Sequence, residues 1–259
     1  MPVFRSGYAV IYYETTGHGP PLVLTHGATL DHHQWTPQVK ALAKDFLIIS
    51  WDVRGHGRSV TPPGTFQHHE AAADLIRLLD HLHIEKAHMC GLSMGAAISL
   101  EAAVTSPHRA ASLILMNSYH SLSTSGFRKL FAPLTHWTRR FVPRLPVAKT
   151  QAKLLARFNR NNQPYIEQTV RSMPKTTWSQ TWHGLSETER TGKLEKVSCP
   201  VLLMHGKQDL VTKNQQNTLF TRLAGATRLE LDDSHHLMNL DQPEQVNEAI
   251  HSFLKEVDN

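Results

Sequence analysis

Cysteine is scarce in this 259-residue sequence, and long apolar runs are absent from it. The two cysteines, Cys90 and Cys199, lie at the ends of apolar runs and are expected to be small core residues in a reducing compartment. A disulfide between them and a catalytic thiol are the less favoured alternatives. No stretch is long and apolar enough to form a secretory signal or to cross a bilayer. The sequence therefore predicts a cytoplasmic protein that does not act in a membrane.

The motifs of several other protein classes are also missing. The sequence has no internal repeat, no coiled-coil heptad and no long run of one charge. No Gly-x-Gly-x-x-Gly segment follows a predicted strand, so no nucleotide cofactor is expected. The helical His-Glu-x-x-His motif is absent, and the eighteen histidines lack a matching cluster of cysteines or carboxylates. We therefore expect no cofactor and no metal.

Charge is distributed unevenly along the chain. The net charge of +5 is too diffuse to indicate nucleic acid as a partner. Between Tyr119 and Ser198, however, 14 Lys and Arg residues stand against 4 Glu and no Asp, a balance of +10. The rest of the chain holds 13 basic and 18 acidic residues, a balance of −5. This difference marks the inner segment as a distinct part of the molecule.

Outside that segment, short apolar runs alternate with helical patterns. The helical pattern is clearest at 70–82, where Leu75, Ile76, Leu79 and Leu82 share one face with Ala72. Strands that alternate with helices predict a mainly parallel sheet with helices on both faces. The strands are expected near 8–15, 20–27, 46–52, 86–92, 111–117, 200–206 and 227–233.

The alternation stops after the strand expected at 111–117 and resumes at 200–206. The residues between are predicted to be helical, and prolines divide them into short helices. A helical insertion between two strands of a parallel sheet would cover the carboxyl edge, where such folds place their sites. We therefore expect a core domain formed by 1–118 and 198–259 and a helical cap formed by 119–197. The large aromatic residues of the expected cap include Trp137, Phe141, Phe158, Trp178 and Trp182.

A serine with unusual neighbours lies where an apolar run meets a helical pattern. The segment Gly91-Leu-Ser93-Met-Gly95 follows a predicted strand and opens a predicted helix. This is the context of the Gly-x-Ser-x-Gly nucleophile elbow, in which a tight turn presents the serine hydroxyl at the positive end of the helix. The alternative is an N-capping serine in a turn softened by glycine. Because a serine hydroxyl is a weak nucleophile, catalysis would require a base and an acid elsewhere.

Candidates for the acid and the base follow the last two predicted strands. Asp209 comes directly after the first strand beyond the expected cap, and His235 and His236 follow the next strand. The strand before the expected cap ends without a carboxylate, and Asp232 and Asp233 lie too close to the histidines to act from behind them. Asp209 is therefore the predicted acid.

Taken together, these segments resemble the α/β-hydrolase family over nearly the whole chain. The matching motifs are LTHGATLDHHQW, WDVRGHGRS, GLSMG, HGKQD and HHLMNLDQPE, in the family's order. The resemblance implies the α/β-hydrolase fold and a Ser-His-Asp triad. Family members carry a Gly-His pair, with an acidic residue five places after the histidine and a proline seven places after it. Counting back from Asp241 and Pro243 selects His236 as the base, and His235 then departs from the pattern by filling the glycine position.

The resemblance also assigns the remaining groups of the site. The family forms its oxyanion hole from two backbone N–H groups, here those of Ala28 and Met94. His26 would brace the loop that carries Ala28, and the segment from Asp52 to Gly57 would have a structural role. The predicted catalytic residues are Ser93, Asp209 and His236.

A serine at the elbow favours acyl transfer, because relatives that open epoxides or displace halide carry aspartate there. The motifs resemble the esterase, enol-lactonase and carbon–carbon bond hydrolase branches alike. We therefore expect a carboxylic ester hydrolase that cleaves a small-molecule ester or lactone through an acyl-serine. A carbon–carbon bond hydrolase, a metal-dependent hydrolase and a receptor with a vestigial triad are the alternatives, and the oligomeric state is open.

The basic residues of the expected cap have two interpretations. They are either solvated on short helices, which is the usual case, or one or two of them face the cleft and favour a substrate with a carboxylate. The candidates for the second role are Arg128, Arg139, Arg140 and Arg157.

Overall fold

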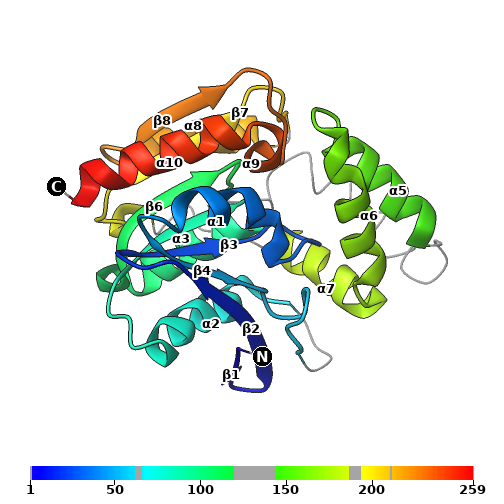
Figure 1. Cartoon of the computed structure of the whole chain (residues 1–259), viewed down its shortest axis with the longest axis horizontal. Coiled ribbons are helices and arrows are strands. Elements are labelled where there is room, and N and C mark those ends of the chain that lie inside the picture. The colour runs from blue at the N-terminus through cyan, green and yellow to red at the C-terminus, as the bar shows by residue number, and fades with distance from the viewer. Residues whose placement is uncertain (1, 62–65, 120–143, 187–193, 211, 259) are drawn as a thin grey trace.

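The computed structural model describes every residue except 1, 62–65, 120–143, 187–193, 211 and 259 (Figure 1). Several residues to which the sequence analysis gave a place in the cap lie outside the described residues: Arg128, Trp137, Arg139, Arg140 and Phe141.

Eight strands form one sheet in the order β1-β2-β4-β3-β5-β6-β7-β8. The six strands from β4 to β8 in this order run parallel, whereas β1 and β2 are antiparallel to their neighbours. Every residue of β5 and β7 is buried, which explains why their sequences are continuous apolar runs rather than alternating ones. The predicted, mainly parallel sheet is confirmed. Its strands are β1 (Val3–Ser6), β2 (Ala9–Thr16), β3 (Pro21–Thr25), β4 (Leu47–Trp51), β5 (Ala87–Leu92), β6 (Ala110–Met116), β7 (Val201–Gly206) and β8 (Thr227–Leu231).

Strand β1 is the one strand of the described sheet that the sequence analysis missed. It has four residues, pairs only with β2 at the edge of the sheet, and alternates exposed and buried positions. Four residues with Arg5 among them give too short a pattern to distinguish a strand from a turn.

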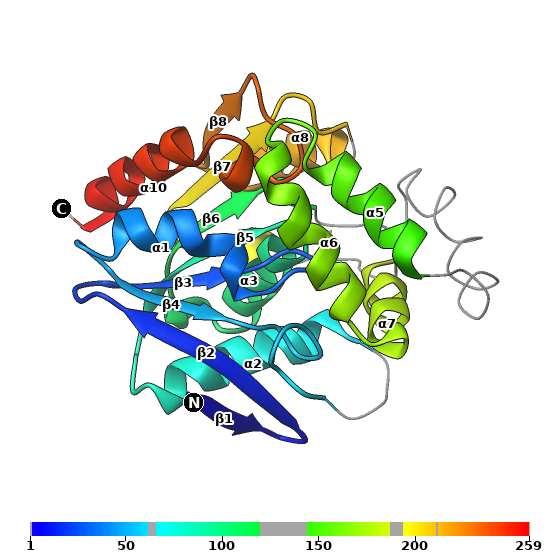
Figure 2. The same ribbon diagram turned by 45° about the vertical axis from the view of Figure 1, so that its right-hand side comes forward.

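Helices cover both faces of the sheet (Figures 1 and 2). On one face, α1, α9 and α10 pack in an apolar cluster with Leu22 and Ile48, and on the other, α2, α3 and α8 pack with Val23 and Ile49. Adjacent residues of one strand therefore enter opposite layers, as the alternation of side chains along a strand requires. The helices are α1 (Thr36–Leu42), α2 (His68–His81), α3 (Met94–Thr105), α8 (Lys213–Arg222), α9 (Met238–Asp241) and α10 (Pro243–Asp258).

Helix α2 contains most of the helix predicted at 70–82, with a different buried face. Leu75 and Leu79 are buried as predicted, but Ile76 and Leu82 are only half-buried. Asp74 occupies the buried face instead, where its carboxylate accepts hydrogen bonds from Arg54 Nε at 2.6 Å and Nη2 at 2.9 Å. A buried carboxylate with a bidentate guanidinium partner is a position that apolar periodicity does not reveal.

Between β6 and β7, the described residues form three further α-helices: α5 (Arg144–Leu155), α6 (Gln163–Ser172) and α7 (Lys175–Ser186). Figure 2 shows them beyond the end of the sheet toward which the arrows of β3 and β6 point. Side chains of α5 and α6 contact the loop after β3, through Gln151 to Thr29 at 2.8 Å and Tyr165 to Asp31 at 2.9 Å. These helices therefore stand at the carboxyl edge of the parallel strands.

The two cysteines are both unpaired, with Cys90 in the core and Cys199 half-buried. None of the helices in the described ranges has the length and apolar character needed to cross a membrane.

Candidate active site

The residues that the sequence analysis selected lie at the carboxyl edge of the sheet. Thr25 of β3 pairs with Gly91 of β5, and Leu92 pairs with Met116 of β6, which pairs in turn with Met204 of β7. The loops that leave these strands therefore begin side by side, at the edge where open α/β folds bind ligands. These loops and the one after β8 carry Ala28, Ser93, Asp209 and His236.

Ser93 forms the turn between β5 and α3. Its φ of 54° lies in a region that residues other than glycine rarely adopt, and its N–H donates to the carbonyl of Met116 at 2.9 Å. A Cβ atom on Gly95 would lie 1.9 Å from the Thr25 carbonyl oxygen, and one on Gly91 would lie 2.3 Å from the Gly95 carbonyl carbon. Close backbone approach therefore requires both glycines, as predicted, and the side chain of Ser93 stays partly exposed.

Asp209 and His236 contact each other directly. The Nδ1–H of His236 donates to Asp209 Oδ2 at 2.8 Å, and the hydroxyl of Thr212 donates to the same oxygen, also at 2.8 Å. Asp209 is fully buried, whereas the side chain of His236 is 17% exposed. Burial alone would lower the pKa of His236, but the charge of Asp209 and its hydrogen bond outweigh burial and hold that pKa above 6.5. The pair thus presents an imidazole with its tautomer fixed by a buried carboxylate.

His235 has different surroundings from its neighbour. Its ring stacks on Phe158, with the ring centroids 6.4 Å apart. The backbone N–H of His235 donates to Asp241 Oδ2 at 2.9 Å. Burial lowers the pKa of His235, and burial raises the pKa of Asp241 to about 6. Asp232 and Asp233, which the sequence analysis set aside, are exposed. The histidine chosen by the motif register is the one that contacts Asp209.

Asn117, directly after β6, joins three backbone groups of the site and was missed in the sequence analysis. Its Oδ1 accepts from the Gly206 N–H at 3.0 Å, and its Nδ2 donates to the carbonyls of His235 and His236 at 2.9 Å each. Its own backbone has a φ of 43°, a conformation that asparagine tolerates better than most residues. Asn117 thus ties the end of β7 to the loop that carries His236.

The loop after β3 contains the backbone group expected to face an oxyanion. His26 is fully buried, with its Nδ1–H donating to the Gly27 carbonyl at 2.8 Å and its Nε2 accepting from the Val53 N–H at 2.9 Å. Burial lowers the pKa of His26, which is consistent with a neutral ring holding these two bonds. Within the described part of the chain, no hydrogen bond from the N–H of Ala28 or of Met94 to another residue is found. Of these two N–H groups, that of Ala28 lies in the loop after β3, and that of Met94 directly follows Ser93 in the sequence.

The turn after β4 has the structural role that the sequence analysis gave it. The buried carboxylate of Asp52 accepts from the backbone N–H of His32 and of Arg58, each at 2.7 Å. A Cβ atom on Gly57 would lie 2.3 Å from that carboxylate. Burial lowers the pKa of His56 to about 3, so this ring stays neutral inside the turn.

Among the described residues, one group of side chains has ligand atoms close enough together to share a metal ion, namely Asp31, His32 and His33. Asp31 Oδ1 already accepts from the His33 N–H at 3.0 Å and from the Tyr165 hydroxyl at 2.9 Å. His32 Nδ1 contacts Asp52 Oδ1 at 2.8 Å. Protein groups thus explain the positions of these side chains, and we assign them no metal.

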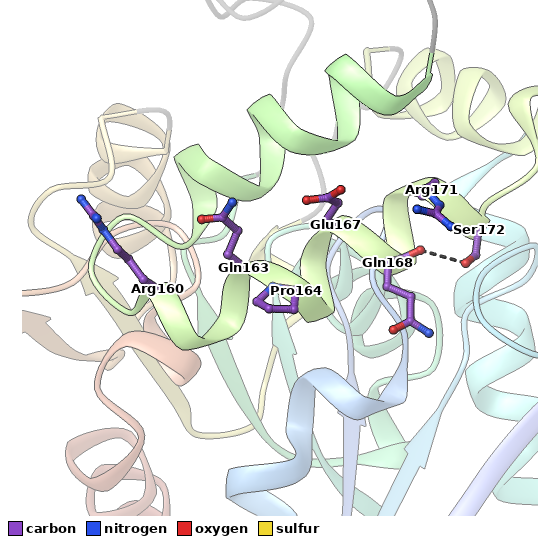
Figure 3. Close-up of a pocket in the computed structure, with 7 residues that line it drawn as sticks. All are labelled: Arg160, Gln163, Pro164, Glu167, Gln168, Arg171 and Ser172. Atoms are coloured by element: carbon purple, nitrogen blue, oxygen red, sulfur yellow. Dashed lines mark hydrogen bonds between the residues drawn. The ribbon is translucent and has the colours of Figure 1, made fainter.

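A pocket runs along α6 (Figure 3). None of the predicted site residues lines this pocket. Its lining comes from one face of α6 and the turn before it, and consists of Arg160, Gln163, Pro164, Glu167, Gln168, Arg171 and Ser172. Arg157, the described member of the arginine set proposed for the cleft, is exposed, and its guanidinium lies 5.8 Å from the centre of the Phe158 ring.

Comparisons with known proteins agree with this fold. The chain is 28% identical to 3-oxoadipate enol-lactonase 1 of Acinetobacter baylyi, over 93% of this chain and 90% of that protein. It is similar to the solved structure of a thermophilic esterase from Thermogutta terrifontis with malate bound, with a TM-score of 0.87, 27% identity, and 97% and 95% of the two chains covered. The enol-lactonase from Burkholderia xenovorans has a TM-score of 0.89 at 24% identity, with 98% and 100% covered, a likeness of fold.

The family model described as the alpha/beta hydrolase fold matches residues 20–243. This match spans most of the chain, from β3 through the loop that carries His236. The chain therefore belongs to the α/β-hydrolase family.

Proposed function

We propose that this hydrolase cleaves small carboxylic esters or lactones through an acyl-serine intermediate. The observation that carries the proposal is the 2.8 Å hydrogen bond from His236 Nδ1 to the buried Asp209 carboxylate, in a loop at the same sheet edge as the Ser93 turn. A carboxylate, an imidazole and a serine in a strained turn are the parts of a Ser-His-Asp triad.

Each residue then has a defined task in the reaction. Asp209 holds the Nδ1–H of His236, which leaves the Nε2 lone pair to accept the Ser93 proton. The bond from Ser93 Oγ to the acyl carbon forms as the carbonyl π pair moves onto oxygen. The N–H groups of Ala28 and Met94 would stabilise that oxyanion. The tetrahedral intermediate then collapses to an acyl-serine, and the leaving alkoxide takes its proton from His236.

The second half of the reaction restores the enzyme. His236 removes a proton from water, the hydroxide adds to the acyl carbon, and the carboxylic acid leaves as Ser93 regains its proton. With a lactone, alcohol and acid remain in one molecule, so a single hydroxy or keto acid is released. The similarity to an enol-lactonase and to an esterase supports both kinds of substrate.

We also propose that residues 119–197 form a cap over the cleft and that residues 1–118 and 198–259 form the core domain. The contacts of α5 and α6 with the loop after β3 support this division. Trp178 and Trp182, whose rings meet edge to face, would supply apolar surface for the acyl part of the substrate.

Substitution of Ser93 tests the proposed function. A fluorophosphonate probe should label the wild-type protein with or without a chelator, and it should not label Ser93→Ala. Turnover of p-nitrophenyl esters should fall by about 10⁴-fold or more in the same variant. More than a tenth of the wild-type activity in pure Ser93→Ala would overturn the assignment. A panel of esters of graded chain length and of lactones then defines the substrate class.

A further inference from the structure

Three buried amide side chains connect the loop that carries Ala28 to the loop that carries His236. They belong to Gln34, Gln38 and Asn239, each of which is 0% exposed. Gln34 Oε1 accepts from the Gly27 N–H at 2.8 Å, and Gln34 Nε2 donates to Asn239 Oδ1 at 3.3 Å. The Gln34 side chain thus bonds to the first loop with its oxygen, and with its nitrogen to α9, the helix that follows the second loop.

The orientation of the Gln34 amide is fixed by its partners. Asn239 Nδ2 donates to the backbone carbonyl of Gln34 at 2.9 Å and to Gln38 Oε1 at 3.0 Å. These two bonds turn Asn239 Oδ1 toward the side chain of Gln34. If the Gln34 amide turned over, its NH₂ group would meet the Gly27 N–H, and its oxygen would meet Asn239 Oδ1. Two hydrogen bonds would become a donor–donor and an acceptor–acceptor contact. The network therefore keeps an acceptor aimed at Gly27.

This acceptor restricts the direction of the Ala28 N–H. The Gly27 carbonyl accepts from His26 Nδ1, and the Gly27 N–H donates to Gln34, so both polar groups of Gly27 are held. The peptide between Gly27 and Ala28 is planar and trans, so its N–H points opposite to its carbonyl. Glycine has the widest choice of φ and ψ, and a bond on each side of Gly27 removes that freedom.

We propose that Gln34 is a positioning residue for the oxyanion hole. Through Gly27 it aims the Ala28 N–H, and through Asn239 it keeps that donor in register with the loop of His236. The inference rests on the proposed function, because the direction of the Ala28 N–H affects the rate only where an oxyanion forms. Without Gln34, the buried Gly27 N–H would lose its acceptor, and the loop would relax toward another partner.

The test compares Gln34→Met with Gln38→Met. Both residues are fully buried and both bond to Asn239, but only Gln34 bonds to Gly27. Each variant is titrated with 1,1,1-trifluoropropan-2-one, to whose carbonyl carbon Ser93 Oγ can add. In that adduct the π pair becomes an oxyanion and His236 takes the serine proton. The kcat and KM for p-nitrophenyl acetate and the melting temperature are measured in parallel.

We expect Gln34→Met to lower kcat by about 10- to 100-fold and to weaken binding of the ketone by a similar factor. Its KM and the pH midpoint of kcat/KM should change little. Gln38→Met should lose thermal stability as well. Because Asn239 Nδ2 keeps its bond to the Gln34 backbone carbonyl in that variant, the affinity for the ketone should stay within about threefold of wild type. Equal losses of ketone affinity in the two variants would indicate a merely structural role and overturn the proposal, as would unchanged affinity in Gln34→Met.

A second pair of variants keeps the test decisive if Gln34→Met does not fold. Gln34→Asn retains an amide but is one methylene too short to reach both partners, and it is compared with Gln38→Asn by the same measurements and criteria. The wild type separates the two levels of inference. If it binds no ketone and Ser93 takes no fluorophosphonate, the proposed function fails and the role of Gln34 fails with it. If the wild type binds the ketone and the Gln34 variants bind it equally well, only the role of Gln34 fails.

Discussion

At the scale of single residues, the two adjacent histidines after β8 have different contacts, so substitutions of one serve as the control for substitutions of the other. His236 contacts Asp209, while His235 stacks on Phe158. His236→Ala should lower kcat as severely as Ser93→Ala, because base and nucleophile act as one unit and losing either costs about as much as losing both. His235→Ala should lower kcat by less than about tenfold, since truncating its ring removes one stacking contact.

Steady-state kinetics on a p-nitrophenyl ester, with circular dichroism as a check of folding, distinguishes the two variants. An inactive His235→Ala enzyme beside an active His236→Ala enzyme would reverse the assignment of the base.

The pH dependence of the rate follows from the surroundings of His236. The proposed reaction needs a neutral imidazole, so kcat/KM should fall as the pH drops through the His236 pKa. Asp209 holds that pKa above 6.5, so the midpoint of the profile should lie above 6.5. The same shift affects stability in the opposite direction. The folded protein binds this proton more tightly than the unfolded chain, and the resulting stabilisation is present at low pH and lost as the pH rises through the folded pKa.

Asp209→Asn tests the cause of that shift. The variant lacks the charge that raises the pKa, and burial then lowers it, so the midpoint should move to lower pH. An asparagine N–H also favours the wrong tautomer, and kcat should fall by about 10⁴-fold. A wild-type profile that is flat from about pH 5 to 8 would argue against a histidine base, and full activity in Asp209→Asn would move the acid elsewhere.

At the scale of elements, Asn117 connects the ends of strands to the loop of His236. Asn117→Ala would leave the Gly206 N–H and the carbonyls of His235 and His236 without this partner. Burying unpaired polar groups costs about 1 to 3 kcal/mol each at most, so the melting temperature should fall and kcat should fall by about tenfold.

Asn217→Ala is the matched control for this substitution, because Asn217 is exposed on α8 and should tolerate the change. Thermal melts and kinetics on both variants check the prediction. A wild-type kcat in folded Asn117→Ala would mean that the backbone alone sets the position of the loop.

Sequence patterns predicted the elements that are buried on both faces better than the others. The central strands β5 and β7 are buried along their whole length, and so is α3 from Met94 to Val104, which is why their sequences are mostly apolar. The edge strand β1 was missed because half of its residues face solvent. In α2, Asp74 occupies a buried position because it contacts Arg54, which lies in the turn after β4. Patterns within an element do not report such partners.

The site was predicted in the same uneven way. Ser93, Asp209 and His236 belong to motifs with fixed spacing, so their places in loops at one edge of the sheet could be expected from the order of strands, and the contact between Asp209 and His236 agrees with that expectation. Asn117 and Thr212 are single polar residues in no motif, although a threonine three places after Asp209 was a usable signal. Gln34 and Asn239 are separated by 205 positions, and only the folded chain brings them together.

At the scale of the whole molecule, α5 and α6 contact the loops on both sides of the proposed triad. Tyr165 of α6 bonds to Asp31 in the loop after β3, and Asn159 and Asn162, which precede α6, donate to the Leu240 carbonyl at 3.0 and 3.1 Å. Helices α5 and α6 and the residues between them are thus hydrogen-bonded to the loop of Ala28 and to α9, the helix that follows His236. Their position is coupled to both sides of the site.

Tyr165→Phe tests this coupling. The variant keeps the ring and loses the hydroxyl, so the free energy of unfolding should fall by about 1 kcal/mol. KM for p-nitrophenyl butyrate should rise by about three- to tenfold with a smaller change in kcat, since the hydroxyl holds the helix and touches no reacting atom. Tyr8→Phe serves as the control, because Tyr8 is 94% exposed. An effect confined to kcat in Tyr165→Phe would contradict the proposed role of the helix.

The long separation between Gln34 and Asn239 has a consequence for biosynthesis. A chain emerging from the ribosome completes β3 and the loop with Ala28 about 200 residues before Asn239 is translated. The parallel strands β3, β4 and β5 can pair in that interval, together with the turn of Ser93. Until Asn239 arrives, the Gln34 amide lacks the acceptor for its NH₂ group, and His236 arrives only three residues earlier. If the proposed function holds, a nascent chain acquires its nucleophile early, and hydrolysis begins only after the segment that carries His236 and Asn239 has been made.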